Sequence, residues 1–239
     1  MDWTMDEQQR ERRVGLIEAH RLDGFFDAAF AFAVSILAIA GTEVPRNLHE
    51  MLLALNRIPA FACSFATLLV FWYRHVRWRE RCRVHDTTSV LISLMLVFFA
   101  LIFVYPLNMV FSAMFNSIYI GFTGNPLPDS LVIEQAHDMS LLFLCYGLAY
   151  ACMAFCLALL YRHSLRHMHD ASREETIEAR ASLYVQIGSA SVALFSVLLA
   201  LVLPSDGWWS AIPGSVYFLL TFVYSLSGRW SRNMLAATS

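Results

Sequence analysis

The sequence predicts an all-α, polytopic membrane protein with six membrane-spanning helices in each subunit. Hydrophobic residues make up 58% of the 239 residues and charged residues only 15%, and the mean hydropathy is +0.53. This balance is typical of a chain that inserts into a bilayer. Apolar windows of about 20 residues, long enough to cross a hydrocarbon core of about 30 Å, recur along the chain. The windows are residues 21–39, 58–73, 88–111, 139–161, 181–203 and 210–227.

The arginines predict how these windows are oriented. All 17 basic residues are arginine, and 15 of them lie at one set of window ends, on the side that also holds both termini. The other side carries only Arg46 and Arg57. By the positive-inside rule both termini are cytoplasmic, which requires an even number of spans. We therefore expect one transmembrane domain over residues 1–239, with a short cytoplasmic segment at 1–18 and a tail at 229–239.

Two connections on the arginine-poor side have distinct patterns. Residues 41–57 contain an amphipathic stripe, which we expect to lie on the membrane surface; its apolar members are Leu48, Met51, Leu52 and Leu55. Residues 115–138 have no cation and contain two glycines and two prolines. They predict a turn-rich surface connection. The polar start of the chain does not resemble a cleaved signal peptide.

The first window is the only one that opens with a cluster of charges, Arg21, Asp23 and Asp27. Ionisable groups at membrane depth are costly, so they face protein or water rather than lipid. The sequence therefore predicts that this helix is covered by other protein or lines an aqueous path.

Helical spacing assigns the residues of this window to faces. Steps of three and four place one set on a single face, namely Arg21, Phe25, Ala28, Phe32, Ser35 and Ile39. A neighbouring face holds Asp27, Ala31, Val34 and Ala38, whose alanines permit close helix packing. Spacing alone leaves a second interpretation open, in which the helix is simply buried and its charges pair with neighbouring helices.

Several motifs resemble those of the bacterial transmembrane protein 175 family, potassium channels related to a lysosomal potassium channel. The family signature on the first helix is R-x-x-x-F-S-D-x-x-x-A, and this chain matches it at Arg21, Phe25, Asp27 and Ala31. The segment FWYRH, with Trp72 and His75, is similar to the aromatic end of the family's second span. The segment VYPLN around Pro106 is similar to its proline-containing third span.

The resemblance implies a homotetramer in which the first helix of each subunit lines a central potassium-permeable pore. Phe32 then stands at the narrowest hydrophobic ring and Ser35 at a polar ring beside it. The other residues that line the pore are Ala28, Ile36 and Ile39. The resemblance further implies an interhelical polar network of Arg21, Asp27, His75 and Trp72. It also implies a bacterial cytoplasmic membrane, potassium as the permeant ion and no cofactor.

Two departures from the family pattern lie on the first helix. Phe26 stands where the family has serine, so the hydrogen bond of that hydroxyl is absent. Phe32 stands where the family has a branched aliphatic residue. Because four phenyl rings at one level fill more space, we expect a pore that closes more completely.

Two other functions also fit these residues. A proton-coupled or small-solute carrier could use Asp27 and Arg21 as a relay, and the bulky Phe32 also fits a non-conducting scaffold. The sequence contains no H-E-x-x-H motif and no phosphate-binding glycine loop. We therefore expect neither an enzyme nor a metal site, and no nucleic-acid partner.

Two further clusters have both a functional and a plain interpretation. His163, His167 and His169 could sense pH between about 5 and 8, or could simply form a solvated rim. Three cysteines share one face of the fourth window, Cys145, Cys152 and Cys156. Since buried cysteine usually packs as a small hydrophobic residue, we expect no metal there.

Overall fold

The computed structural model describes the backbone of residues 3–39, 45–82, 86–128, 136–167, 172–204 and 207–236. This part of the chain is helical and contains no strand, as the sequence predicts. The helices are α1 (Trp3–Ile39), α2 (Leu48–Leu55), α3 (Ile58–Cys82), α4 (Thr87–Thr123), α5 (Ala136–His167), α6 (Arg173–Val202), η1 (Gly207–Ala211), α7 (Ile212–Ser215), η2 (Val216–Phe218) and α8 (Leu219–Ala236).

The membrane-spanning elements number five or six in the described residues. Five helical stretches are long and apolar enough to cross a membrane by themselves. The pair α2 and α3 passes the same test only together, and its two helices are bent by 46° at the break between them. The second predicted span, residues 58–73, lies within α3, which does not pass the test alone. One reason is that the last turns of α3 carry arginines, which lower its hydropathy.

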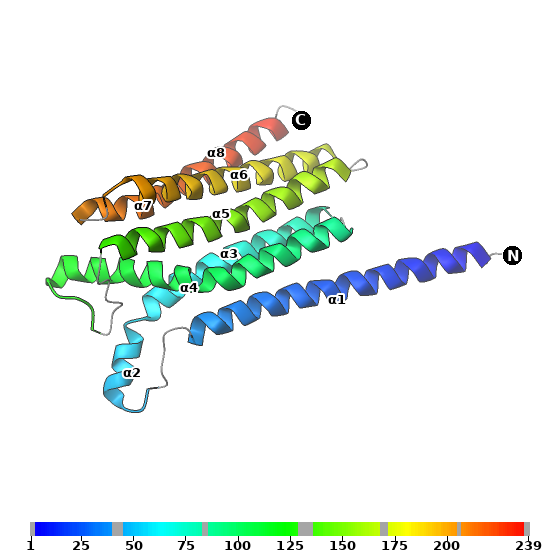
Figure 1. Ribbon diagram of the computed structural model, residues 1–239. Helices are drawn as coiled ribbons and strands as arrows, with labels where there is room; N and C mark the ends of the chain where they lie inside the picture. The colour runs from blue at the N-terminus through cyan, green and yellow to red at the C-terminus, as the bar shows by residue number, and fades with distance from the viewer. Residues whose placement is uncertain are drawn as a thin grey trace.

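The long helices lie side by side in one bundle (Figure 1). Both termini are at the same end of the bundle, and the N-terminal part of α1 extends beyond the other helices. The same end holds the arginine-bearing end of α3, the C-terminal end of α5 and the start of α6. This arrangement agrees with an even number of crossings.

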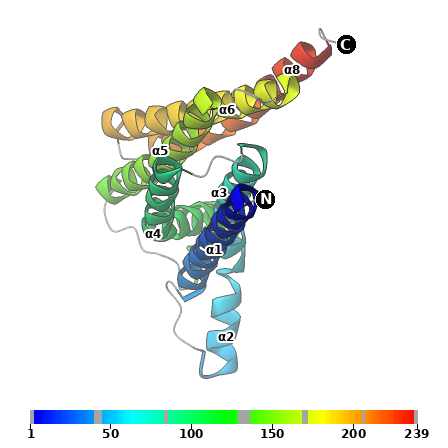
Figure 2. The same ribbon diagram turned by 90° about the vertical axis from the view of Figure 1, so that its right-hand side faces the viewer.

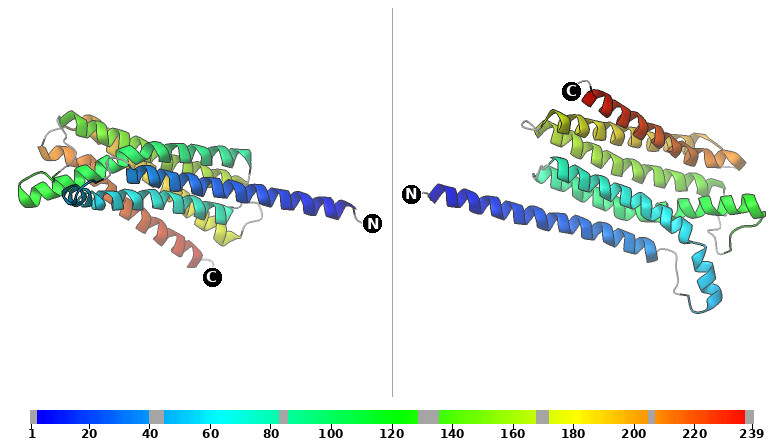
Figure 3. Two further views of the ribbon diagram at one scale, coloured as in Figure 1. Left: turned by 90° about the horizontal axis from the view of Figure 1, so that it is seen from below. Right: turned by 180° about the vertical axis from the view of Figure 1, so that it is seen from behind.

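The pore candidate α1 lies at one edge of the bundle, where it packs against α3 and α4 (Figure 2). From there the layers continue through α5 and α6 to α8 at the opposite edge. Figure 3 shows α2 turning away from the bundle. None of the eight residues of α2 is buried, and Leu48 and Leu52 are more than half exposed, which suits the predicted surface helix.

Local sequence signals define the helix ends. Asp86 caps α4 in a reciprocal capping box with Ser89, and Ser172 caps α6 in the same way with Glu175. At the other end α4 stops at Gly124, whose φ of 73° is in the left-handed region that favours glycine.

The expected loop at residues 115–138 was placed too early, because α4 continues to Thr123. Gly121 does not end the helix, since a single helical glycine costs only about 1 kcal/mol. Residues 129–135 of that loop lie outside the described residues. With 37 residues α4 is about 55 Å long, which exceeds a hydrocarbon core of about 30 Å.

The core between α3, α4 and α5 is rich in aromatic rings. The buried Phe103 ring lies 5.2 Å from Tyr146 and 6.2 Å from Phe71, while Tyr150 lies 5.0 Å from Phe71 and 5.5 Å from Tyr217. Most of these pairs meet edge to face, the geometry that aromatic quadrupoles favour. This cluster fixes α3 and so provides the support on which α1 is placed.

Candidate pore helix and its polar junction

The side of α1 that faces the bundle is a continuous apolar stripe. Phe26, Phe30, Ala33 and Leu37 follow at steps of four, three and four, and each is at most 5% exposed. This spacing is that of one helix face. The stripe packs into the common core with α3 and α4.

The opposite side of α1 is uncovered within one chain. Every residue that helical spacing assigns to one face of the first window is exposed: Arg21, Phe25, Ala28, Phe32, Ser35 and Ile39. Phe32 is 60% exposed and Ile39 72%. The Ser35 hydroxyl donates to the carbonyl of Ala31 at 3.0 Å, so it is held against its own helix. Ile36 differs from the set, because it is half-buried against the core and lies at the edge of the exposed face.

Both acids at the start of the span are bound by α3. The Trp72 indole N–H donates to the Asp27 carboxylate at 2.8 Å. One turn earlier on α1, Asp23 forms an ion pair with Arg79, whose side chain is only 12% exposed. These contacts hold α1 at a fixed rotation, with its apolar stripe toward the bundle.

His75 completes the junction from α3 to α4. Its Nε2 lies 3.0 Å from the Ser93 hydroxyl, and it is 2% exposed. Its ring meets Phe26 at 5.1 Å. Arg21 is exposed, and among the described residues it has no hydrogen bond or ion pair. The structure thus brings Asp27 to Trp72 and His75 to Ser93, while the role of Arg21 in the network stays a prediction.

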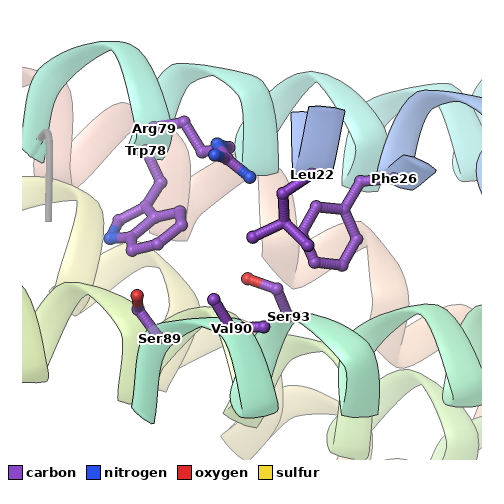
Figure 4. A pocket seen from close by; sticks show the side chains of 7 residues that line it. All are labelled: Leu22, Phe26, Trp78, Arg79, Ser89, Val90 and Ser93. Carbon is purple, nitrogen blue, oxygen red and sulfur yellow. The ribbon is translucent and has the colours of Figure 1, made fainter. Parts of the chain in front are cut away.

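A small pocket lies where α1, α3 and α4 meet (Figure 4). Its side chains converge from the three helices and are Leu22, Phe26, Trp78, Arg79, Ser89, Val90 and Ser93. The Arg79 guanidinium lies 5.6 Å from the centre of the Phe26 ring. Its Nε is buried without a hydrogen-bond partner among the described residues.

The similarity to known proteins includes the helices that form this junction. Residues 21–106, which include the α1 span, α3 and the first half of α4, match the family model of "Endosomal/lysosomal potassium channel TMEM175". A protein of Marivirga tractuosa named "Potassium channel" is 28% identical over 215 residues, covering 87% of this chain and 86% of that protein. Over residues 21–106 the chain is therefore similar to the TMEM175 family.

A solved TMEM175 structure shares the fold. It is the crystal structure of a variant of the potassium channel MtTMEM175 in complex with a Nanobody-MBP fusion protein. The TM-score is 0.73, with 24% identity, and the match covers 89% of this chain and 93% of that one. The helical bundle described above therefore has the same fold as that structure.

Three residues of this junction are not among the residues that the sequence predicts. The sequence assigns Arg79 only to the orienting arginines, and it does not mark Ser93. Phe26 was treated as the loss of a serine hydroxyl, whereas its ring packs on His75 and under Arg79. A signal for Phe26 was present, because it starts the stripe that continues at Phe30, Ala33 and Leu37.

The histidine and cysteine clusters separate in the structure. His163 and His167 lie at the end of α5 with their ring centres 4.4 Å apart, while His169 lies outside the described residues. Cys145 is exposed and Cys156 is buried, so these cysteines do not share one environment. In the described part of the chain no three His, Cys, Asp or Glu side chains gather in a way that could hold a metal ion.

Proposed function

We propose that this protein is a potassium-permeable, moderately selective cation channel, assembled as a homotetramer around a central pore lined by α1. The observation that carries the proposal is the two-sided character of α1. One face is buried in its own subunit, and the opposite face, which begins with Arg21, is uncovered. A face that opens with a cation is a poor surface for lipid. Meeting copies of itself around an aqueous axis would cover it.

In this proposal Phe32 forms the constriction, and Ser35, Ala28 and Ile39 line the pore, with Ile36 at the edge of the lining. A ring of apolar side chains in a narrow pore excludes water and so gates by dewetting. Hydroxyls beside it can replace part of an ion's hydration shell. Because the ring is apolar and the hydroxyls are few, the selectivity for potassium is moderate.

The polar network behind α1 keeps this face pointed at the axis. Asp27 and Trp72 form one link, and His75 braces α3 against α4. Arg21 is exposed in one chain, and in the assembled channel it joins this network. The network therefore acts as a positioning device and does not touch the ion.

The arginine-rich end of the bundle faces the cytoplasm, and the protein resides in a bacterial cytoplasmic membrane. The positive-inside rule supports this orientation, since the ends of α3 and α5 carry Arg79, Arg81 and Arg166 on the side of both termini. The channel needs no cofactor, has no nucleic-acid partner and is not an enzyme. Its partners are the lipid bilayer, potassium and three copies of itself.

Potassium flux from purified protein in liposomes, measured together with the oligomeric mass in detergent, tests the proposal. We expect a tetrameric mass and flux that follows the potassium gradient without saturation, with a smaller flux when sodium replaces potassium. Saturating flux coupled to protons would instead indicate the carrier. A monomeric mass, or no flux from protein that stays folded, contradicts the channel.

A further inference from the structure

Arg74 on α3 is a half-buried cation whose contacts are all with neutral side chains. Its Nη1–H donates to the side-chain oxygen of Gln186 on α6 at 3.2 Å, and Gln186 is only 2% exposed. The guanidinium lies 4.8 Å from the centre of the Tyr224 ring on α8 and 5.7 Å from that of Phe71. The Tyr150 hydroxyl on α5 lies close to it as well. Among the described residues no carboxylate pairs with Arg74.

Two other arginines of α3 differ from Arg74 in this respect. Arg81 pairs with Glu178 on α6 at 3.0 Å, and Arg79 pairs with Asp23 on α1. A cation at membrane depth without a counter-charge is costly, because neutral partners replace only part of its lost hydration. An anion from the surroundings would supply the charge that Arg74 lacks.

The Arg74 guanidinium is open to such an anion. Arginine carries five N–H donors, and one of them is bound by Gln186. No nitrogen of Arg74 is among the buried polar atoms that lack a partner in the described residues. The donors without a protein partner therefore reach the surface, beside Tyr224, which is 38% exposed. A fork of free N–H groups matches the oxygens of a phosphate.

A second cation lies one turn away on the same side of α3. Arg77 follows Arg74 by three positions, which makes the two side chains neighbours on the helix surface. The Arg77 side chain is 43% exposed, and its guanidinium lies 5.8 Å from the centre of the Tyr73 ring. Its contact with Glu80 is 3.9 Å long and exposed, so it compensates the charge of Arg77 only weakly. Arg74 and Arg77 thus form a basic patch with Tyr73 and Tyr224 beside it.

The basic patch lies at an apolar boundary. The second apolar window, residues 58–73, stops directly before Arg74, and the arginine-rich end of α3 begins there. On the apolar side of this boundary, exposed side chains continue at Val70, one turn before Arg74, and at Phe222 on α8. Tyrosines and arginines at the end of an apolar surface are typical of the interface between bilayer and water. The patch is therefore placed near the lipid headgroups, with apolar surface next to it for acyl chains.

The position of α8 favours lipid as the source of the anion. It lies at the edge of the bundle opposite α1 (Figure 2), and only 11% of the apolar stretch in Trp209–Met234 is buried. Figure 3 shows α8 crossing the bundle obliquely, with its C-terminal end away from α3. With α1 at the axis of the proposed channel, the edge that carries α8 faces the bilayer.

We propose that Arg74 and Arg77 bind the phosphate of an anionic phospholipid in the leaflet at the arginine-rich end of the bundle. The phosphate supplies the counter-charge of Arg74 through charge-assisted hydrogen bonds to its guanidinium. The acyl chains lie along the exposed surface at Val70 and Phe222. A zwitterionic lipid binds more weakly, because its ammonium group is repelled by the two arginines.

Lipid binding to the purified, delipidated chain tests the site. Phosphatidylglycerol or phosphatidylcholine is titrated into the detergent micelles, and the bound lipid is counted by native mass spectrometry. We expect the wild type to bind phosphatidylglycerol more tightly than phosphatidylcholine. Arg74→Gln should weaken phosphatidylglycerol binding about tenfold or more, the loss typical of a hydrogen bond between charged groups. Arg77→Gln should weaken it about two- to fivefold, because Arg77 is more exposed.

Arg166→Gln is the matched control, since Arg166 is exposed at the same end of the bundle and the change in net charge is the same. We expect it to leave the phosphatidylglycerol affinity unchanged. Equal weakening in Arg166→Gln, unchanged affinity in Arg74→Gln and Arg77→Gln, or equal binding of the two lipids by the wild type overturns the site. If Arg74→Gln does not fold, Arg77→Gln and the comparison of the two lipids decide the outcome.

Glycerol phosphate, a phosphate ester without acyl chains, separates a lipid site from a site for a soluble anion. We expect phosphatidylglycerol to raise the Tm of the wild type and glycerol phosphate to leave it unchanged. An equal rise with both, lost in Arg74→Gln, overturns the lipid and assigns the patch to a soluble phosphate ester. Binding and Tm are measured without ion flux, so a failure of the proposed channel leaves these results interpretable.

Discussion

Trp72 on α3 donates its indole N–H to the carboxylate of Asp27 on α1 at 2.8 Å. Together with the ion pair of Asp23 and Arg79 one turn away, it fixes which face of α1 points into the bundle. The consequence is geometric. With the acids turned to α3, the face that carries Phe32 is left uncovered in the single chain.

Replacing Trp72 by phenylalanine should weaken the attachment of α1. The ring is kept in large part, but the Asp27 carboxylate loses its donor, and hydrogen bonds to charged groups contribute about 1.5–3 kcal/mol. Because Asp27 is exposed in the single chain, we expect the lower part of that range. Unfolding of the purified variant in detergent measures the loss.

Trp230→Phe is the control for that measurement, since Trp230 lies on α8 and its ring meets Tyr184 edge to face at 5.5 Å. It loses similar ring area without breaking a contact to α1. Equal losses in the two variants would show that ring size, rather than the bond to Asp27, stabilises this region.

Two acid-to-amide changes should differ sharply in how much they lower the free energy of unfolding. Asp23→Asn leaves the largely buried Arg79 guanidinium without its counter-charge, and removing one partner of a buried pair costs about 3–5 kcal/mol. Since Asp23 is itself 40% exposed, we expect a smaller loss, about 1–3 kcal/mol.

Glu80→Gln should leave the free energy of unfolding nearly unchanged. Its contact with Arg77 is 3.9 Å long between side chains that are 61% and 43% exposed. Exposed pairs of this kind contribute about 0–1 kcal/mol. Urea unfolding of both variants compares them directly, and equal effects would refute a structural role for the Asp23 pair.

Close packing of α5 and α6 depends on Gly147. A Cβ atom there would lie 2.6 Å from Val197 Cγ2 and 3.2 Å from the backbone carbonyl of Ala193. We expect Gly147→Ala to destabilise the protein by about 1–3 kcal/mol, the range for overpacking. Gly121→Ala on α4 is the control, because nothing lies within 4 Å of its added Cβ and alanine favours a helix. A free energy of unfolding that is unchanged in Gly147→Ala would contradict this packing.

The sequence predicted the faces of α1 well, because helical periodicity acts along a single element. All six residues that steps of three and four assign to one face, from Arg21 to Ile39, are exposed in the structure. The exposed side is wider than that face, since Asp27, Ala31 and Ala38 of the neighbouring predicted face are exposed as well. The number of spans was also close, since hydropathy and the arginine distribution reflect the same membrane constraint.

Contacts between distant segments were less predictable. The pairing of Asp23 with Arg79 joins residues far apart in the chain. From the sequence alone, several neighbouring arginines are equally good candidates for the partner of Asp23. The packing of Phe26 on His75 depends on the relative rotation of two helices, which no periodicity gives. The end of α4 was missed because glycine at 121 and glycine at 124 look alike until one of them adopts a positive φ.

The central claim is that Phe32 faces a shared conduction path. Phe155 on α5 offers a matched control, because it is 57% exposed against 60% for Phe32 and lies on a helix away from the proposed axis. Potassium flux in liposomes should be compared for the wild type, Phe32→Ala and Phe155→Ala at equal amounts of folded protein. The account predicts a clear rise in flux for Phe32→Ala only; flux that is unchanged in Phe32→Ala, or raised equally by both changes, would contradict it.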